Sequence, residues 1–235
     1  MSTSGGATWT DIDKAMGDGY ALAYGSILEA GCLADESTGS VRMAVCRTTN
    51  NGKTWSRVML STENGYVKTL AVHPKNKKIL LAGGRITKGM DSYSKLYKST
   101  DGGFKWVEIT SLSQNSSCVN AISFDPSDSK RVLLGMKDGI WKSTDEGTTW
   151  IAPGQQIVAT SIVADPLTRG RFFAGSSEGV WMSVDGGQSW KELNDGLSCR
   201  SVLCIEFDPV NAILYAGTER GGVVRLNLSN KKKPI

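Results

Sequence analysis

The stretch Ser99-Thr100-Asp101-Gly102-Gly103-Phe104-Lys105-Trp106 decides the fold, because its pattern recurs along the chain of 235 residues. The pattern is Ser/Thr-x-Asp/Asn-x-Gly-x-x-Trp, and it returns at residues 48–55, 143–150 and 183–190, with a degenerate copy at residues 2–9. Successive tryptophans of the pattern are roughly 40–50 residues apart, which indicates a solenoid or a propeller and matches the length of a four-stranded propeller blade.

A second repeat runs in phase with the first. Its core is an Asp/His-Pro pair followed by an apolar strand that ends in Gly, and the pairs begin at His73, Asp125, Asp165 and Asp208. A third element, a tetrapeptide, follows at residues 95–98, 139–142, 179–182 and 222–225. Each unit therefore contains four short strands separated by turn signals, which is the pattern of an all-β fold.

The turn pattern has a structural explanation. An Asp or Asn side chain can bond its own backbone, a Gly supplies positive φ, and a Ser or Thr hydroxyl can hold another amide of the turn. The Trp can bury a large apolar face. We therefore interpret the following residues as structural rather than catalytic: Asn50, Trp55, Asp101, Trp106, Asp145, Trp150, Asp185 and Trp190.

The pattern resembles the Asp-box (BNR) repeat of sialidases, sortilin-type receptors, two-propeller xyloglucanases and photosystem II assembly factors. The resemblance covers almost the whole chain. It implies a β-propeller in which each box lies on the turn between the third and fourth strands, at the rim and away from the ligand face.

Counting the units predicts a single all-β domain, a five-bladed β-propeller of four-stranded antiparallel blades. The last unit lacks a turn pattern, and residues 2–9 supply a spare one. Because closure removes exposed sheet edges, we expect the N-terminal strand to complete the last blade and close the ring. The expected blades are residues 19–60, 65–111, 117–153, 157–194 and 199–229, the last completed by residues 1–12.

Composition indicates an ordinary globular chain with a mild net charge of +4, which gives no reason to expect a nucleic-acid partner. We expect no membrane span, metal or cofactor, because no long apolar run, Cys-x-x-Cys motif or phosphate-binding loop occurs. Cys32 and Cys46 can form a disulfide or remain buried thiols. The odd cysteine count and the lack of a visible signal peptide suggest a reducing compartment, such as the cytoplasm, with incorporation into a virion as a variant of this expectation.

A binding surface is expected on the face that carries the loops between second and third strands. These loops are long at residues 33–40 and 84–94 and short in later units. Long loops on one face of a repeat protein often carry binding. The candidate binding residues on these loops are Arg85, Lys88, Asp91, Tyr93, Lys137, Glu178 and Arg220.

Two functions fit this surface. The favoured expectation is a non-catalytic interaction module, not an enzyme, that docks a protein partner through one face. Its basis is the absence of the sialidase Phe/Tyr-Arg-Ile-Pro motif and of room for the second propeller of a xyloglucanase. The alternative is a carbohydrate-binding or glycoside-hydrolase-like propeller with a glycan as its partner, because the fold alone does not decide function.

Overall fold

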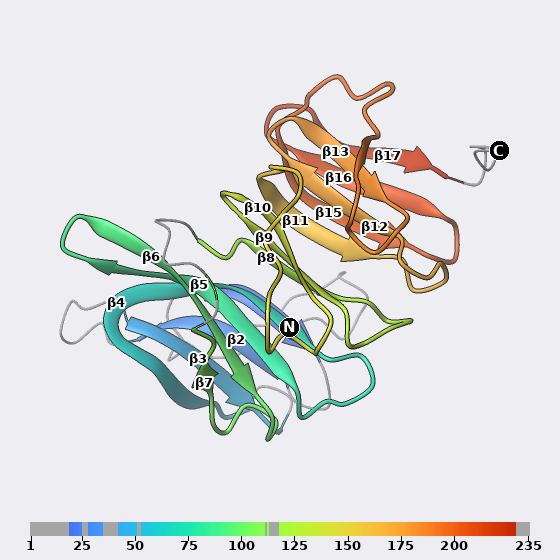
Figure 1. Ribbon diagram of the computed structural model, residues 1–235. Helices are drawn as coiled ribbons and strands as arrows, with labels where there is room; N and C mark the ends of the chain where they lie inside the picture. The colour runs from blue at the N-terminus through green and yellow to red at the C-terminus, as the bar shows by residue number, and fades with distance from the viewer. Residues whose placement is uncertain are drawn as a thin grey trace.

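The structure is a computed structural model that describes residues 19–24, 28–34, 42–50, 53–110, 112 and 118–228, with side chains described from Arg42 onward. Its named elements are all β-strands, and they form antiparallel sheets (Figure 1). None of the described residues belongs to a helix that could span a membrane. The predicted closing segment, residues 1–12, lies outside the described residues, as do residues 35–41 of the first long loop.

The strands form four sheets in which chain order is also spatial order or its reverse. The first sheet has seven strands, β1 (Gly19–Tyr24), β2 (Leu28–Ala34), β3 (Arg42–Thr48), β4 (Ser56–Val72), β5 (Leu80–Lys88), β6 (Asp91–Ser99) and β7 (Val107–Glu108). The second has β8 (Ala121–Phe124), β9 (Val132–Met136) and β10 (Gly139–Ser143). The third has β11 (Ala159–Ala164), β12 (Phe172–Ser176), β13 (Gly179–Ser183) and β14 (Lys191–Glu192), and the fourth has β15 (Val202–Asp208), β16 (Ile213–Thr218) and β17 (Gly222–Asn227).

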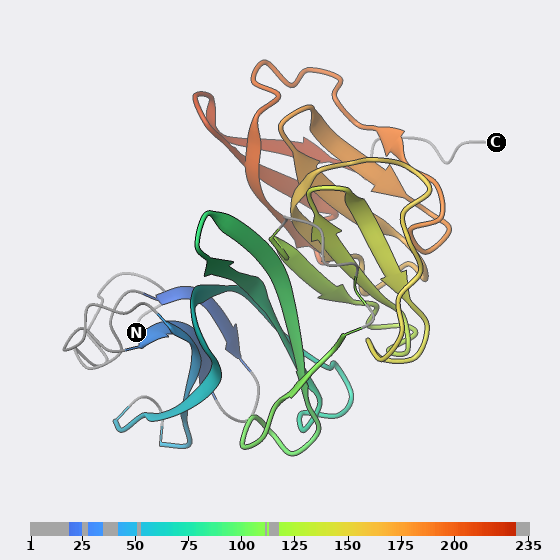
Figure 2. The same ribbon diagram turned by 60° about the vertical axis from the view of Figure 1, so that its left-hand side comes forward.

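The sheets follow one another along an arc, as Figures 1 and 2 show. Strand β4 contacts β8, β8 contacts β11, and β11 contacts β15, so the first strand of each later unit lies beside the first strand of the unit before it. Apolar side chains fill the space between neighbouring sheets. The largest fully buried ones include Phe172, Phe173, Leu81 and Leu133.

The expected ring of five four-stranded blades is not what the structure shows, because the first two units share one sheet. Strand β4 runs for 17 residues through the expected border at residues 60–65 and pairs with both β3 and β5. Gly65 permits this pairing, since a Cβ there would lie only 2.3 Å from the carbonyl oxygen of Arg85. The described residues therefore form four sheets in an arc.

Residues 84–94 were expected to form a long loop, and this expectation is wrong. Strands β5 and β6 continue through this segment, pairing Arg85 with Ser94 and Lys88 with Asp91. The connection is the short turn Gly89-Met90, in which Gly89 has φ 61°. Glycine adopts this left-handed conformation without the steric cost that other residues meet.

The four Asp/Asn turns, residues 48–55, 99–106, 143–150 and 183–190, share one hydrogen-bond pattern. In the second of them, Asp101 Oδ1 accepts the backbone N–H groups of Phe104 at 3.0 Å and Lys105 at 2.9 Å. The Ser99 hydroxyl donates to Asp101 Oδ1 and accepts the N–H of Gly103 at 2.9 Å. Asn50 Oδ1 accepts the Thr54 N–H in the same way. Side-chain oxygens thus hold each turn.

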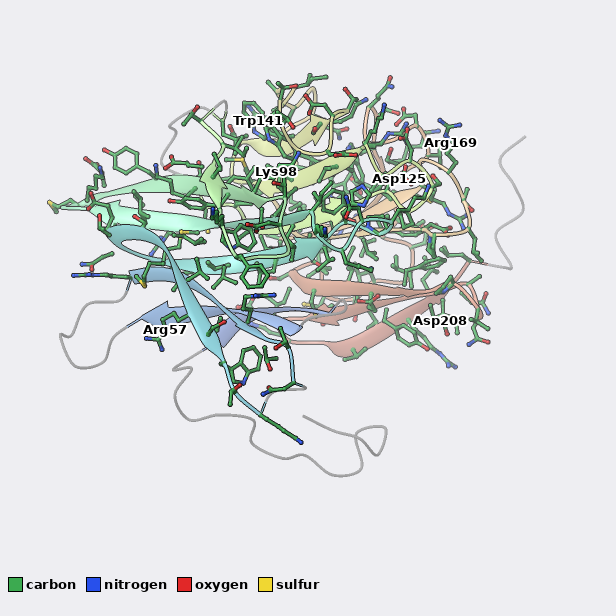
Figure 3. The ribbon with its side chains drawn as sticks, turned by 90° about the horizontal axis from the view of Figure 1, so that it is seen from below. Arg57, Lys98, Asp125, Trp141, Arg169 and Asp208 are labelled. Atoms are coloured by element: carbon green, nitrogen blue, oxygen red, sulfur yellow. The ribbon has the colours of Figure 1, made fainter. Side chains whose placement is uncertain are left out.

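The Asp-Pro turns at the same ends of the sheets also use a side-chain acceptor. Oδ1 of Asp125 accepts the N–H groups of Ser127 and Asp128, and Oδ1 of Asp208 those of Val210 and Asn211. Asp125 and Asp208 lie toward the same side of the molecule in Figure 3. In its unit, His73 stands at the Asp position, and its ring atom Nδ1 is the acceptor in place of a carboxylate oxygen.

The cysteines differ in state. Cys46 is disulfide-bonded, whereas Cys118, Cys199 and Cys204 are free thiols. The alternative that Cys46 is a buried free thiol is therefore wrong.

Candidate functional site

A polar pocket of about 250 Å³ lies at the outer edge of the first sheet, where β7 ends and β6 continues. Strand β7 pairs with β6 through Tyr97–Glu108 and Lys98–Val107, and the Ile109 N–H then donates to the Leu96 carbonyl at 2.8 Å. The tip of the β5–β6 hairpin forms the other wall. The described lining residues are Ile86, Lys88, Tyr93, Ser94, Lys95, Glu108, Ile109, Thr110 and Leu112.

Two ion pairs lie at the pocket. Lys95 pairs with Glu108, and their side chains are 22% and 37% exposed. Lys88 Nζ lies 3.3 Å from Glu63 Oε1, between two side chains that are about half exposed. Ion pairs with exposed side chains contribute little to stability. Because all four side chains are partly exposed, a ligand can reach both cations and both carboxylates.

Tyr97 is the buried neighbour of Glu108. Burial and then the Glu108 carboxylate raise the pKa of Tyr97 to about 12, while a hydrogen bond with Ser61 acts in the opposite direction. The phenol therefore stays protonated at any physiological pH. Tyr97 packs with Ile86 and Tyr93 in one apolar cluster. This cluster holds in place the face of the hairpin that lines the pocket.

Two buried polar atoms lie on the opposite face of the same hairpin segment. Ser94 Oγ and Arg85 Nε each have no hydrogen-bond partner, and the two residues are direct cross-strand partners. The Arg85 guanidinium lies 5.3 Å from the centre of the Tyr66 ring. Most buried polar atoms in proteins are paired, so these two are exceptions, and neither is presented to the pocket because both are buried on the other face.

The structure brings together only part of the predicted binding set. Lys88 and Tyr93 line the pocket, and Arg85 and Asp91 belong to the same hairpin. Lys137, Glu178 and Arg220 lie apart from it, in the exposed turns that follow β9, β12 and β16. These three side chains are therefore distributed over the later sheets and form no common pocket with the hairpin.

Lys95 and Glu108 are absent from the predicted binding set. Lys95 begins the third repeated tetrapeptide, whose first position in the later units is Gly139, Gly179 and Gly222. A charged residue in a glycine position was the signal that could have identified it. Glu108 has a counterpart in Glu192 of the third sheet, which pairs with Trp181 in the same register and has its own contact with Arg200.

The pocket can bind a polyhydroxylated ligand. Lysine and hydroxyl groups donate hydrogen bonds, Glu108 accepts them, and Ile86, Ile109 and Leu112 supply an apolar floor. A few polar groups around apolar walls is the usual composition of a ligand pocket, although this one is smaller than the roughly 300–1,000 Å³ of drug-sized sites. Among the described lining residues Glu108 is the one carboxylate, whereas glycoside hydrolysis commonly uses two.

Asp101, Asp145 and Asp185 use their carboxylates within their own turns. Asp145 Oδ1 accepts from the N–H groups of Thr148 and Thr149, and Asp185 Oδ1 from those of Gln188 and Ser189. Burial raises the pKa of Asp145 and of Asp185, and several hydrogen bonds outweigh it and bring each to about 2. The structural interpretation of the turn residues stays a prediction for mutagenesis.

No protein-family model matches the chain. The chain is 29% identical over 143 residues to the xyloglucanase Xgh74A of Acetivibrio thermocellus, and the match covers 48% of this chain and 16% of that enzyme. A xyloglucanase of Hypocrea jecorina is also 29% identical, over 150 residues, with 17% of that enzyme covered. The match thus spans about one sixth of the length of these curated relatives.

Solved structures share the fold. An ancestral GH74 enzyme superposes with a TM-score of 0.67 and 18% identity, over 95% of this chain and 32% of that one. YCF48 bound to a D1 peptide superposes with a TM-score of 0.50 and 16% identity, over 68% of this chain and 50% of that one. These neighbours are β-propellers, so the all-β, propeller-like architecture is confirmed at the level of the fold.

The comparisons overturn the favoured functional expectation. The chain was expected to be a non-catalytic interaction module and not an enzyme, but its sequence relatives are xyloglucanases and a GH74 enzyme has the same fold. The absence of a sialidase motif argues against one class of enzyme, the sialidases. It gives no argument against other glycoside hydrolases. The carbohydrate-directed alternative is the one that the comparisons favour.

Proposed function

We propose that this chain is a propeller of a glycoside hydrolase that acts on xyloglucan, and that the pocket at β6 and β7 holds part of the polysaccharide. The observation that carries the proposal is the 29% identity to xyloglucanases over 143 residues. The pocket supports it, because its hydroxyl, lysine and carboxylate groups suit a ligand made of sugar hydroxyls. As part of the same proposal, the four turns are Asp boxes and the propeller is a ring of five blades.

Glu108 and Lys95 are the residues to which we assign the ligand contact. Their ion pair lies at the pocket with both side chains partly exposed, and a sugar hydroxyl can accept from the ammonium and donate to the carboxylate at once. Hydrogen bonds to charged groups are about twice as strong as neutral ones. Loss of either charge should therefore weaken glycan binding.

Calorimetry with xyloglucan oligosaccharides tests the assignment. Glu108→Gln should weaken binding by about 1.5–3 kcal/mol, the usual contribution of a hydrogen bond to a charged group. The matched control is Glu192→Gln, which alters the same repeat position on the third sheet, away from the pocket. Equal affinities of both variants and the parent would remove the pocket from the proposal.

Release of reducing ends from xyloglucan tests the enzymatic part. We expect release by the parent protein and a lower rate for Glu108→Gln. A protein that binds the oligosaccharides but releases no reducing ends would contradict the hydrolase and leave the glycan site. Absence of both binding and hydrolysis would contradict the whole proposal.

A further inference from the structure

The β5–β6 hairpin has a second face, opposite the one that carries Lys88. Near the base of the hairpin this second face packs on the second sheet, since a Cβ on Gly83 would lie 2.5 Å from Val119 Cγ1. Because side chains alternate along a strand, Arg85 and Thr87 follow Gly83 on the same face. The face therefore changes from an apolar contact at Gly83 to polar side chains where the hairpin extends away from the second sheet (Figure 1).

The register of four strands places polar residues in two rows on this face. Residues directly opposite each other in neighbouring strands have their side chains on the same face of the sheet. We call the seven residues of the two rows the arginine face; one of them is exposed and the other six are partly exposed. The first row is Arg42 of β3, Asn64 of β4, Thr87 of β5 and Ser92 of β6, and the second row is Tyr66, Arg85 and Ser94.

The arginine face carries positive charge without a carboxylate to balance it. Among the described residues, no carboxylate forms an ion pair with Arg42 or Arg85. On the opposite face of the same hairpin, Lys88 pairs with Glu63. The charges of the hairpin are thus paired on the face that carries Lys88, whereas the arginine face presents two cations that have no counter-ion in the described part of the chain.

Both guanidinium groups are partly removed from water. The Nε atoms of Arg42 and Arg85 are buried and have no hydrogen-bond partner, although each residue as a whole is partly exposed. The Arg85 guanidinium lies 5.3 Å from the centre of the Tyr66 ring. A cation that has lost part of its hydration gains more from an anion than a fully hydrated one, because the local dielectric constant is lower. The planar guanidinium group also matches a carboxylate through two parallel N–H groups.

A third cation lies at the border of the arginine face. Lys68 Nζ donates a hydrogen bond to Asn120 Oδ1 at 2.9 Å. Burial raises the pKa of the Cys118 thiol, while the charges of Lys68 and Arg85 and a hydrogen bond with Tyr66 act against this effect. These three side chains therefore lie around one thiol, and the positive potential continues from the arginine face to the start of the second sheet.

We propose that the arginine face binds an acidic polysaccharide through the carboxylates of its uronic acid residues. Arg42 and Arg85 are two strands and two residues apart in the register, which corresponds to roughly 12 Å between their Cα atoms. Two cations at this separation suit a polymer with a carboxylate on successive sugars better than one small anion. The proposal goes beyond xyloglucan, which carries hydroxyl groups and no carboxylate, and it requires no hydrolysis.

The other side chains of the arginine face suit a sugar chain. Tyr66 offers an aromatic ring, and Asn64, Thr87 and Ser92 offer amide and hydroxyl groups that can both donate to and accept from sugar hydroxyls. The choice of a sugar over an acidic protein segment rests on the proposed carbohydrate function. An acidic protein segment would carry the same charge, so the experiment compares the two directly.

Calorimetry with a hexamer of galacturonic acid tests the proposal. The parent protein should bind the hexamer, and the methyl ester of the hexamer, which has the same sugars without their charge, should bind at least tenfold more weakly. Arg85→Gln should weaken binding of the acid at least tenfold and Arg42→Gln at least threefold, because each variant removes one cation. The matched control is Arg169→Gln, which removes the same charge from an exposed side chain beside Asp128 and should bind like the parent.

Arg85→Lys separates charge from shape. Lysine keeps the charge but not the two parallel N–H groups, so its affinity should lie between those of the parent and Arg85→Gln. The comparison of acid and ester uses the parent alone and stays decisive if a variant does not fold.

Equal binding of acid and ester, or equal losses in Arg85→Gln and Arg169→Gln, would overturn the proposal. Tighter binding of poly-glutamate than of the hexamer would assign the arginine face to an acidic protein segment and would also overturn it. A parent protein that releases reducing ends from xyloglucan without binding the hexamer would overturn this proposal alone, whereas binding of the hexamer without action on xyloglucan would support it and contradict the proposed hydrolase.

Discussion

Asp145 shows how much one carboxylate contributes to a turn. Its two oxygens accept hydrogen bonds from the N–H groups of Thr148 and Thr149 and from the hydroxyls of Ser143 and Thr149. Asp145→Ala should lower the free energy of unfolding by about 1–2 kcal/mol, as the loss of a helix cap does. Urea denaturation measures this change.

The control for this variant is Asp145→Asn. The amide retains an oxygen acceptor, as Asn50 does in the first turn, so Asn should cost less than Ala. Because hydrogen bonds outweigh burial and hold the pKa of Asp145 at about 2, below its usual 3.8, its stabilising effect is present above pH 4 and is lost as the pH falls toward 2. Equal stability of all three proteins would contradict a structural role.

His73 should make the first of the Asp/His-Pro turns, the His73-Pro74 turn, sensitive to pH. Its Nδ1 accepts the N–H groups of Lys75 at 3.1 Å and Asn76 at 2.8 Å, and its Nε2 lies 3.8 Å from Glu146 Oε1 of the next sheet. Burial lowers the pKa of His73 below 6.5; Glu146 acts against this, and Lys75, Lys98 and Lys77 act with it. Protonation would place a hydrogen on the atom that accepts both bonds.

The melting temperature should therefore fall between pH 7 and pH 5. A group with a lowered folded-state pKa stabilises the protein above its unfolded pKa, and this contribution is lost as the pH falls through the folded value. His73→Asn keeps a neutral acceptor and should melt with a smaller dependence on pH in this range. Parallel pH curves for the two proteins would show that His73 does not control the turn.

At the scale of elements, the β5–β6 hairpin depends on the geometry of its turn. Gly89 has φ 61° and nothing within 4 Å of an added Cβ, so Gly89→Ala tests backbone conformation without a steric clash. We expect a loss of about 1 kcal/mol in thermal unfolding. Gly154→Ala is the control, because Gly154 also has open space around it and does not have positive φ. Equal effects would indicate that residues 84–94 are a flexible loop.

The strands of the later units could be predicted from the sequence because each carries two turn signals and a buried apolar run. Val132–Met136 and Phe172–Ser176 are examples, and all of their residues are buried. The continuation of β4 through Asn64 and Gly65 could not be predicted, because Asn-Gly is a turn signal. In the structure this dipeptide belongs to a strand, and its backbone lies close to Arg85 of the neighbouring strand. The hairpin tip was missed for a related reason, since its side chains are polar.

The candidate site was predictable only in part. Lys88 and Tyr93 were predicted as neighbours, and both line the pocket. Their segment lies at the same edge of the first sheet whether it forms a loop or a hairpin. Lys95 and Glu108 were not identified because their proximity arises from pairing between β6 and β7, and a two-residue strand leaves little periodic signal. Lys137, Glu178 and Arg220 share a topological position but belong to different sheets.

For the whole molecule, the outer edge of β17 is the end of the arc, because β17 pairs with β16 alone among the described strands. If residues 1–12 complete the last blade, as the sequence predicts, deletion of residues 1–13 should lower the melting temperature and cause association that grows with concentration. Deletion of residues 231–235, which removes the lysine-rich end, should change neither property. Light scattering and thermal denaturation check both variants, and identical behaviour of the two truncated proteins would contradict the role of the first segment.

Two glycines of the Asp/Asn turns have a consequence for how such a chain can be lengthened. A Cβ on Gly147 would lie 2.9 Å from Leu81 Cδ1, and one on Gly187 would lie 2.8 Å from Leu133 Cδ2, so each of these two turns fits closely against a leucine of the preceding sheet. The unit that can be duplicated or grafted is therefore the interface between two sheets and not a single sheet. A transplanted sheet must carry its glycine turn, and the sheet before it must present a leucine at the matching position. Swapping whole sheets between propellers should succeed where this pair is conserved across the junction and fail where it is mismatched.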